Sequence, residues 1–148
     1  MKIVNKKFGR EYEMIEAYEA GIALTGAEVK SIRDGRMKLD DAYVKIVGNE
    51  PYLLNAEIYP YRFEKTDNQE SKRSRKLLLH KKEIVRIKTK MRGSGKLTIA
   101  PVSCYNKGRH IKLEIALVRG RRDVEKRKLE KQKKIRRQDQ KEVKEYVR

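Results

Sequence analysis

Large apolar residues alternate with Lys112, Glu114 and Ala116 near the end of the chain, and this pattern constrains the fold more than any other sequence feature. Apolar side chains stand at every second position along one stretch, namely Ile111, Leu113, Ile115 and Leu117. A period of two residues is that of a β-strand with one buried face. The stretches "KLTIAPVSCY" and "RHIKLEIAL" flank "NKG", so this region is predicted to form an antiparallel hairpin.

Other segments add strands to this hairpin. Residues Tyr12 to Leu24 are rich in β-formers and are predicted to form a strand. Two short strands around Gly48-Asn49 predict a second hairpin. Between Tyr59 and Lys76 the chain is polar and has no period, which indicates a mobile surface loop.

Two helices are expected between the strands. Thr25 and Glu28 have the spacing of a capping box, so a helix is predicted to start there and to end at Gly35. This spacing favours a structural role for Glu28. A second helix is predicted from His80 to Met91, with a break at Gly93.

Strands outnumber helices in this interpretation, and hairpin-type links join them. The pattern predicts a mainly β, α+β chain with an antiparallel, barrel-like sheet and helices packed against it. With 148 residues, the chain has room for one domain and an extension. We expect the domain to span residues 1–122 and the extension residues 123–148.

The net charge narrows the class of partner. Lys and Arg outnumber Asp and Glu by 39 to 21, which gives a net charge of +18 and favours polyanionic partners, RNA in particular. No apolar run approaches the roughly 20 residues that span a bilayer, and the N-terminus lacks a signal-peptide pattern, so no membrane partner is expected. A single cysteine, Cys104, fits a reduced cytoplasmic location.

The C-terminal extension has a different composition from the rest of the chain. From Arg119 to Arg148 it carries fourteen basic and six acidic residues and no proline. On a helical wheel its few apolar residues fall within an arc of about 140°, but they are too sparse for a helix that is stable alone. Two interpretations stay open: a solvated, partly helical charge run, or a segment that orders on a polyanionic surface.

Catalytic and metal-binding motifs are not found. His80 and His110 are far apart and have no motif partner, so a ribonuclease is a weak alternative. Neither the ligand spacings of zinc sites nor a phosphate-binding loop is present, and Cys104 is expected to be a buried thiol. We therefore expect a binding protein without cofactor or metal, in which Tyr or Phe side chains can stack on RNA bases. For Tyr18, Tyr43 and Tyr52, which occupy predicted strand positions, packing in the core is the favoured alternative.

Four motifs together resemble a known family. "YEAGIALTGAEVKSIRDG", "DAYV", "RKLLLHKKEI" and "IALVRGRR" occur in the order and spacing of the SsrA-binding proteins, also called small protein B. The resemblance covers roughly residues 4 to 122. It implies an oligonucleotide-binding-type β-barrel with flanking helices.

The resemblance also implies a function. Members of the family bind the tRNA-like domain of transfer-messenger RNA and accompany it, with elongation factor Tu, to stalled ribosomes for trans-translation. The protein body then takes the place of an anticodon arm. The extension, disordered when free, is expected to become helical in the empty mRNA channel near the decoding centre. A general rRNA-binding or ribosome-assembly protein is the alternative that charge alone would allow.

Site residues follow from matching the motifs. The RNA-binding set comprises polar, apolar and basic side chains of the first 122 residues: Asn5, Lys6, Lys7, Glu19, Lys30, Arg33, Leu78, Lys112, Arg119, Arg121 and Arg122. The ribosome-binding set lies in the extension: Glu125, Lys126, Arg127, Lys131, Lys133, Lys134, Arg136 and Arg137. The chain departs from the family pattern at Arg10, where many members have histidine.

Overall fold

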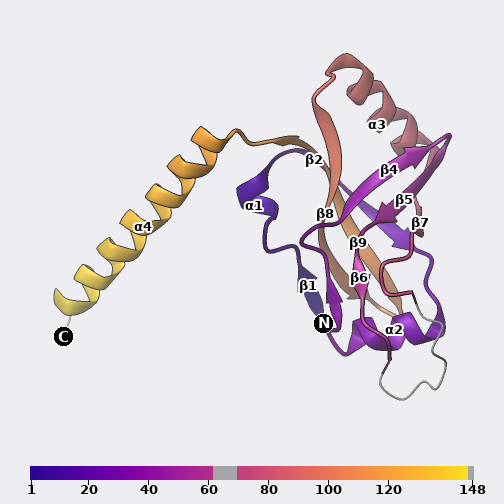
Figure 1. Ribbon diagram of the computed structural model, residues 1–148, viewed down its shortest axis with the longest axis horizontal. Helices are drawn as coiled ribbons and strands as arrows, with labels where there is room; N and C mark the ends of the chain where they lie inside the picture. Colours follow the sequence, from indigo (N-terminus) through magenta and orange to yellow (C-terminus); the bar gives the residue numbers. More distant parts are fainter. Residues whose placement is uncertain (62–69, 147–148) are drawn as a thin grey trace.

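A computed structural model describes residues 1–61 and 70–146 of the chain. Its elements follow the order β1 (Lys2–Val4), α1 (Phe8–Glu11), β2 (Tyr12–Ile22), α2 (Gly26–Arg33), β3 (Met37–Lys38), β4 (Tyr43–Val47), β5 (Glu50–Leu54), β6 (Glu57–Ile58), β7 (Arg75–Leu78), α3 (Lys81–Gly93), β8 (Leu97–Lys107), β9 (His110–Gly120) and α4 (Asp123–Tyr146). Figure 1 shows the strands gathered into one body, from which α4 projects.

Seven strands form an antiparallel sheet that curves back on itself. Their order is β1-β8-β4-β5-β7-β2-β9, and β8 also pairs with β9, so the sheet becomes a nearly closed ring. The joint between β4 and β8 is narrow, because in the described chain it consists of the single pair Val44–Ile99. Strands β3 and β6 form a separate pair. The predicted α+β class and antiparallel sheet are thereby confirmed.

The β8–β9 hairpin supplies the centre of the core. The alternating residues Ile111, Leu113, Ile115 and Leu117 are all buried inside the ring, as their period predicts. The turn differs from the prediction, since β8 continues through Asn106 and Lys107 and only Gly108 and Arg109 connect the strands. Gly108 has a φ of +62°, which suits the first position of a two-residue hairpin turn.

The outer face of the same hairpin is covered at one end by α1. Ala100, Ala116 and Val118 are buried there against Phe8 and Tyr12. The rings of these two aromatic residues lie 5.7 Å apart between centroids. This second, smaller core fixes α1 on the end of the sheet from which the chain leaves toward α4.

Both predicted helices are present and have the expected ends. In α2 the hydroxyl of Thr25 accepts from the Glu28 N–H at 3.2 Å, and the Glu28 carboxylate accepts from the Thr25 N–H at 3.0 Å. The last residue of α2 is Arg33, and the predicted terminating glycine, Gly35, follows two residues later with a φ of +75° and donates its N–H to the Ile32 carbonyl. In α3, Ile84 and Ile87 are buried, and the helix ends at Gly93 as predicted.

One prediction was wrong at the end of the polar segment between Tyr59 and Lys76. Its residues 62–69 lie outside the described part of the chain, but Arg75 and Lys76 belong to β7 and pair with β5. Arg75 is completely buried. The polar composition of this segment suggested an exposed loop. A strand is possible there because the charge of Arg75 is compensated inside the protein rather than by water.

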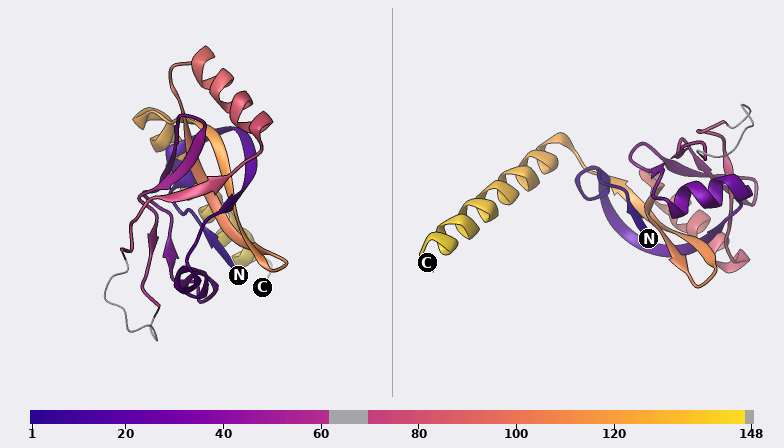
Figure 2. Two further views of the ribbon diagram at one scale, coloured as in Figure 1. Left: turned by 90° about the vertical axis from the view of Figure 1, so that its right-hand side faces the viewer. Right: turned by 90° about the horizontal axis from the view of Figure 1, so that it is seen from below.

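Residues Asp123–Tyr146 form one helix, α4. The absence of glycine and proline allows a continuous helix over this length. The right-hand view of Figure 2, like Figure 1, shows α4 extending away from the strands, so most of its length has no neighbour in the described part of the chain. The expectation that this segment orders only on a ribosome stays a prediction.

Candidate nucleic-acid interface

Three of the predicted contact residues lie on neighbouring strands of one sheet surface. In the register of the sheet, Gly21 of β2 stands opposite both Leu78 of β7 and Lys112 of β9. Glu19 lies two residues before Gly21 and therefore on the same face. The strand order β7-β2-β9 thus brings Glu19, Leu78 and Lys112 together from segments far apart in the sequence.

Gly21 permits the close approach within this group. A side chain there would place its Cβ 3.2 Å from the Cβ of Leu78, which is tighter than most real contacts. Leu78 lies over the glycine and is 59% exposed, while its neighbour Leu77 is buried in the core. An exposed leucine on a strand between charged residues can make an apolar contact with a ligand.

Glu19 is held by two side chains that were not predicted. The Tyr105 hydroxyl donates to one carboxylate oxygen of Glu19, and Lys107 Nζ donates to the other at 3.0 Å. These hydrogen bonds lower the pKa of Glu19, so the carboxylate is charged at neutral pH. Burial and the bond to Glu19 raise the pKa of Tyr105 to about 12. Glu19 is thus a fixed acceptor for base-edge or hydroxyl donors.

Tyr105 and Lys107 could have been found from the hairpin register. Tyr105 pairs directly with Lys112 across β8 and β9, and Lys107 pairs with His110. Placing the turn at "NKG" assigns the wrong cross-strand partners to Tyr105 and Lys107. Placing it at Gly108-Arg109 gives the observed pairs. The missing signal was therefore the position of the turn.

A groove of about 240 Å³ continues the surface toward α2. Leu78 and Lys112 line it together with Arg109 and His110 of the hairpin turn region. Arg33 of α2 donates from a guanidinium nitrogen to the Arg109 carbonyl at 3.3 Å. This contact places a predicted basic residue beside the groove.

A second hollow lies between the N-terminal segment and the end of α2. Lys6 and Arg33 line this hollow of about 630 Å³, together with Asp34 and Asp40. Lys30 lies on the same helix as Arg33, with its ammonium nitrogen 5.4 Å from the ring centroid of Tyr61. Lys6, Lys30 and Arg33 are exposed and available to phosphate.

Asn5 and Lys7 make contacts within the protein. The Asn5 side chain is only 3% exposed and donates to the Pro101 carbonyl at 2.9 Å. Its backbone N–H donates to the Val102 carbonyl at 2.9 Å, at the position where a bulge interrupts β8. Lys7 Nζ pairs with Asp41 at 3.0 Å. Asn5 therefore fixes the N-terminal segment to the sheet.

The three predicted arginines Arg119, Arg121 and Arg122 lie at the end of β9 and just after it. Arg119 and Gly120 still belong to β9, and Arg119 pairs with Glu13 on the neighbouring strand. Arg121 Nε donates to the carbonyls of Gly9 and Tyr12, each at 3.2 Å. Arg122 is exposed. The turn thus anchors the chain to α1 as well as presenting basic groups.

Two ion pairs join α4 to α1. Lys126 Nζ lies 2.8 Å from Glu11 Oε2, and Arg10 Nε lies 2.8 Å from Glu130 Oε1. The pair with Lys126 lowers the pKa of Glu11. The other predicted tail residues are exposed along α4: Glu125, Arg127, Lys131, Lys133, Lys134, Arg136 and Arg137.

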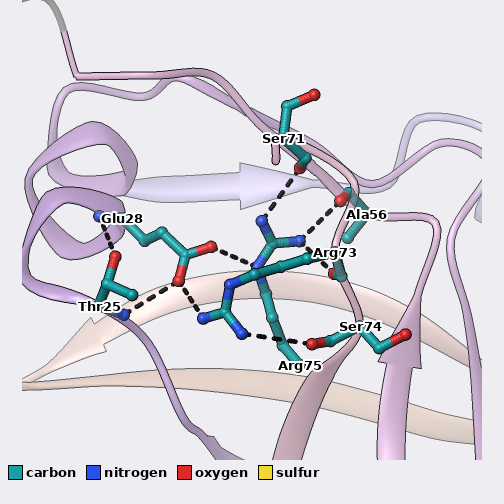
Figure 3. A network of polar contacts seen from close by, with 7 residues as sticks. All are labelled: Thr25, Glu28, Ala56, Ser71, Arg73, Ser74 and Arg75. Carbon is teal, nitrogen blue, oxygen red and sulfur yellow. Dashed lines mark hydrogen bonds and ion pairs between the residues drawn. The ribbon is translucent and has the colours of Figure 1, made fainter. Parts of the chain in front are cut away.

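The role of Glu28 is structural, as its capping position predicts. Its carboxylate accepts from Arg75 Nε at 2.6 Å and also pairs with Arg73 (Figure 3). Burial opposes the ionisation of Glu28, but the hydrogen bonds from Arg73, the Thr25 N–H and Arg75 outweigh it and lower its pKa. The network ties α2 to the start of β7.

Arg75 completes that network with main-chain acceptors. Its guanidinium donates to the carbonyls of Ala56, Ser71 and Arg73 at 2.9 to 3.0 Å. A buried guanidinium with so many acceptors is satisfied, so Arg75 is not available to a ligand. Sequence reasoning missed it because no local signal separates a buried arginine from its exposed neighbours.

Within the described ranges, no group of three or more His, Cys, Asp or Glu side chains is arranged to hold a metal ion. His80 stands at the N-cap of α3. Cys104 is buried, which raises its pKa to about 12. Of the described helices, none combines the length and the apolar character that crossing a bilayer requires.

Comparisons with known proteins agree with the motifs. Residues 2–145 match the family model described as SmpB protein. The SsrA-binding protein of Pseudothermotoga lettingae is 47% identical over 140 residues, which is 93% of each chain. The SsrA-binding protein of a Sulfurihydrogenibium species is 44% identical over 140 residues, covering 95% of this chain and 91% of the relative.

A solved structure adds a comparison of fold. A chain described under "tmRNA-SmpB: a journey to the center of the bacterial ribosome" superposes on this one with a TM-score of 0.68 and 38% identity. The superposition covers 82% of this chain and 85% of that chain.

Proposed function

The chain belongs to the SmpB protein family, and from this premise we propose that it binds transfer-messenger RNA and acts with it on the ribosome in trans-translation. It is an RNA-binding protein rather than an enzyme. The observation that carries the proposal is the convergence of Glu19, Leu78 and Lys112 on one sheet surface.

This surface supplies three complementary kinds of contact to a folded RNA. The Glu19 carboxylate accepts hydrogen bonds from base edges or a 2′-hydroxyl, Leu78 packs on an exposed base or sugar, and Lys112 neutralises phosphate. The groove with Arg109 and His110 extends the same surface, and Arg33 borders it. We assign the tRNA-like domain of transfer-messenger RNA to this face.

The ring of strands fits an oligonucleotide-binding-type barrel, which is the architecture we propose for residues 1–122. The basic helix α4, residues 123–146, is proposed to enter the mRNA channel of a stalled ribosome near the decoding centre. Elongation factor Tu would accompany the same RNA, and the work would take place in the bacterial cytoplasm. Both roles are consistent with a chain that carries a net charge of +18.

Binding to the isolated tRNA-like domain tests the proposal. A gel-shift measurement should show tight binding that survives an excess of bulk tRNA. Glu19→Ala should weaken this binding by roughly 1–3 kcal/mol, because it leaves donors unpaired at a desolvated interface. Equal affinity for both RNAs, with a steep loss in salt, would instead indicate a general rRNA-binding protein.

The chain offers a matched control for Glu19. Glu50 also accepts from a tyrosine and a lysine, with the Tyr52 hydroxyl at 2.7 Å and Lys76 Nζ at 3.2 Å, but it lies on β5. Glu50→Ala therefore removes the same local contacts and the same charge. It should leave RNA affinity within about twofold of the unmodified protein, since β5 lies outside the three neighbouring strands β7, β2 and β9 that carry the proposed contact residues.

A further inference from the structure

A groove between α3 and β4 lies outside the residues assigned to transfer-messenger RNA. It has a volume of about 570 Å³, and its walls include Tyr43, Lys45 and Ile46 of β4 and Lys88, Met91 and Arg92 of α3. It opens at the narrow joint of the ring, where β4 pairs with β8 only through Val44 and Ile99. From Lys45 onward, this edge of β4 has no second strand partner in the described sheet.

An aromatic ring stands at the mouth of this groove. Tyr43 is 45% exposed, and it lies between Ala42 and Val44, which are buried in the core. Ile46 and Met91 pack against the core and give the groove an apolar wall. A half-exposed tyrosine beside apolar side chains offers a planar face on which a flat ring can stack.

The charges around the groove have one sign. Lys45, Lys88 and Arg92 contribute three cations, and no carboxylate is found among the described lining residues. Lys88 Nζ donates to Asn49 Oδ1 at 2.8 Å, whereas Lys45 and Arg92 have no ion-pair partner in the described ranges. The hollow beside α2 differs, because Asp34 and Asp40 reduce its positive charge.

Two other cations of α3, unlike those at the groove, form ion pairs with a carboxylate of the protein. Arg86 pairs with Glu16 at 3.1 Å, and Lys90 pairs with the same carboxylate. These two residues tie α3 to β2 and are engaged in the fold. Lys88 and Arg92 of the same helix form no ion pair among the described residues, so their charges are available to an external anion.

We propose that this groove binds an unpaired RNA nucleotide, with the base stacked on Tyr43 and its flanking phosphates at Lys45, Lys88 and Arg92. An aromatic platform with a basic rim is the combination that single-stranded nucleic acid requires. An acidic peptide would use the cations but not the ring and the apolar wall. The choice of RNA over another nucleic acid rests on the proposed function. The contacts that favour a single-stranded nucleic acid are independent of that function.

Binding of a short single strand to the full chain tests this site. The probe is a fluorescent decamer of uridylate, followed by anisotropy. Tyr43→Ala should weaken binding at least about fivefold, the lower end of the effect of a base–aromatic stack. Tyr43→Phe keeps the ring and should stay within twofold, while urea unfolding verifies that both variants are folded.

The cations are tested by the salt dependence of the same binding. The double variant Lys45→Gln with Arg92→Gln should reduce the slope of log K against log salt by about 1.4, since each phosphate contact on a single strand contributes about 0.7. Lys81→Gln with Lys82→Gln removes the same charge from the exposed first turn of α3. This control should leave the slope unchanged.

Crosslinking locates the base directly. A decamer that contains 5-iodouridine should crosslink to the peptide that carries Tyr43. A crosslink elsewhere, an unchanged affinity of Tyr43→Ala, or equal competition by polyglutamate of the same charge would overturn the proposal. Gel shifts with the tRNA-like domain keep the two hypotheses separate, because loss of the groove site would leave the Glu19 surface intact.

Discussion

The β8–β9 hairpin and helix α4 lie next to each other in the sequence but are stabilised in different ways. In the hairpin, Leu113, Ile115 and Leu117 are completely buried, and strands β1, β2 and β4 pair with it. Every described side chain of α4 from residue 130 to residue 141 is exposed. The hairpin is therefore fixed by burial, whereas the helix depends on local propensity and on two ion pairs at its start.

This difference indicates that the strands and their buried core form a rigid platform, whereas α4 needs a partner to be stabilised along its length. Exposed ion pairs contribute at most about 1 kcal/mol each, so Arg10–Glu130 and Lys126–Glu11 orient the first turns of α4 without stabilising its far end. The contact surface of Glu19, Leu78 and Lys112 belongs to the platform. Four experiments test this contrast.

Deleting residues 123–148 should have the largest effect, and only on one activity. We expect peptide tagging on stalled ribosomes to fall to background, while affinity for the tRNA-like domain stays within about threefold. The physical reason is that the proposed RNA face makes no use of α4. A reconstituted tagging assay and a gel shift on the same preparation measure both, and a lost RNA affinity would contradict the division.

Replacing Glu28 by Gln should destabilise the platform strongly. The substitution leaves the buried guanidinium of Arg75 without its counter-charge, which costs about 3–5 kcal/mol. Urea unfolding followed by tyrosine fluorescence measures the loss. Glu50→Gln, which removes a carboxylate from an exposed pair, should change stability by less than about 1 kcal/mol.

Acid should weaken the platform through the same carboxylate. The pKa of Glu28 is lower in the folded protein than in the unfolded chain. Its contribution is therefore complete above the unfolded pKa of about 4.3 and is lost as pH falls through the folded value. The urea midpoint of the unmodified protein should drop over this range, and that of Glu28→Gln should drop less. Parallel curves would contradict the assignment.

Removing the partly buried pair at the start of α4 should have the smallest effect. Lys126→Gln breaks the contact with Glu11, and we expect a loss of about 0.5 kcal/mol. Hydrogen exchange of the amides that follow Arg122 should then quicken about twofold. Lys131→Gln, at a position with no ion pair among the described residues, serves as the control and should leave these rates unchanged.

Much of the platform could be predicted from local sequence signals. The capping box of Thr25 and Glu28, the turn at Gly48 and the alternation from Ile111 to Leu117 each depend on neighbours within a few residues. The ring could not be predicted in the same way, because its closure depends on pairing between segments distant in the chain. Arg75 illustrates the limit, since only the folded protein shows that Glu28 compensates its charge.

The candidate site shows the same limit. Motif matching proposed Glu19, Leu78 and Lys112 as separate positions, and the strand order shows that they are neighbours. It did not identify Tyr105 and Lys107, which depend on a hairpin register that was shifted at the turn. Asn5 was also assigned to RNA by motif matching, and only the structure shows that its side-chain amide donates to the Pro101 carbonyl at the bulge of β8.

The uninterrupted strand β9 fixes the distance between the proposed RNA surface and the start of α4. Lys112 stands near the beginning of this strand and Gly120 at its end, so about 26 Å of extended backbone separates the proposed phosphate contact from the end of β9. Only Arg121 and Arg122 intervene before α4. Under the proposed function, the length of this one strand sets the distance between the RNA and the start of α4, and two additional residues in β9 would move α4 about 7 Å farther from the RNA.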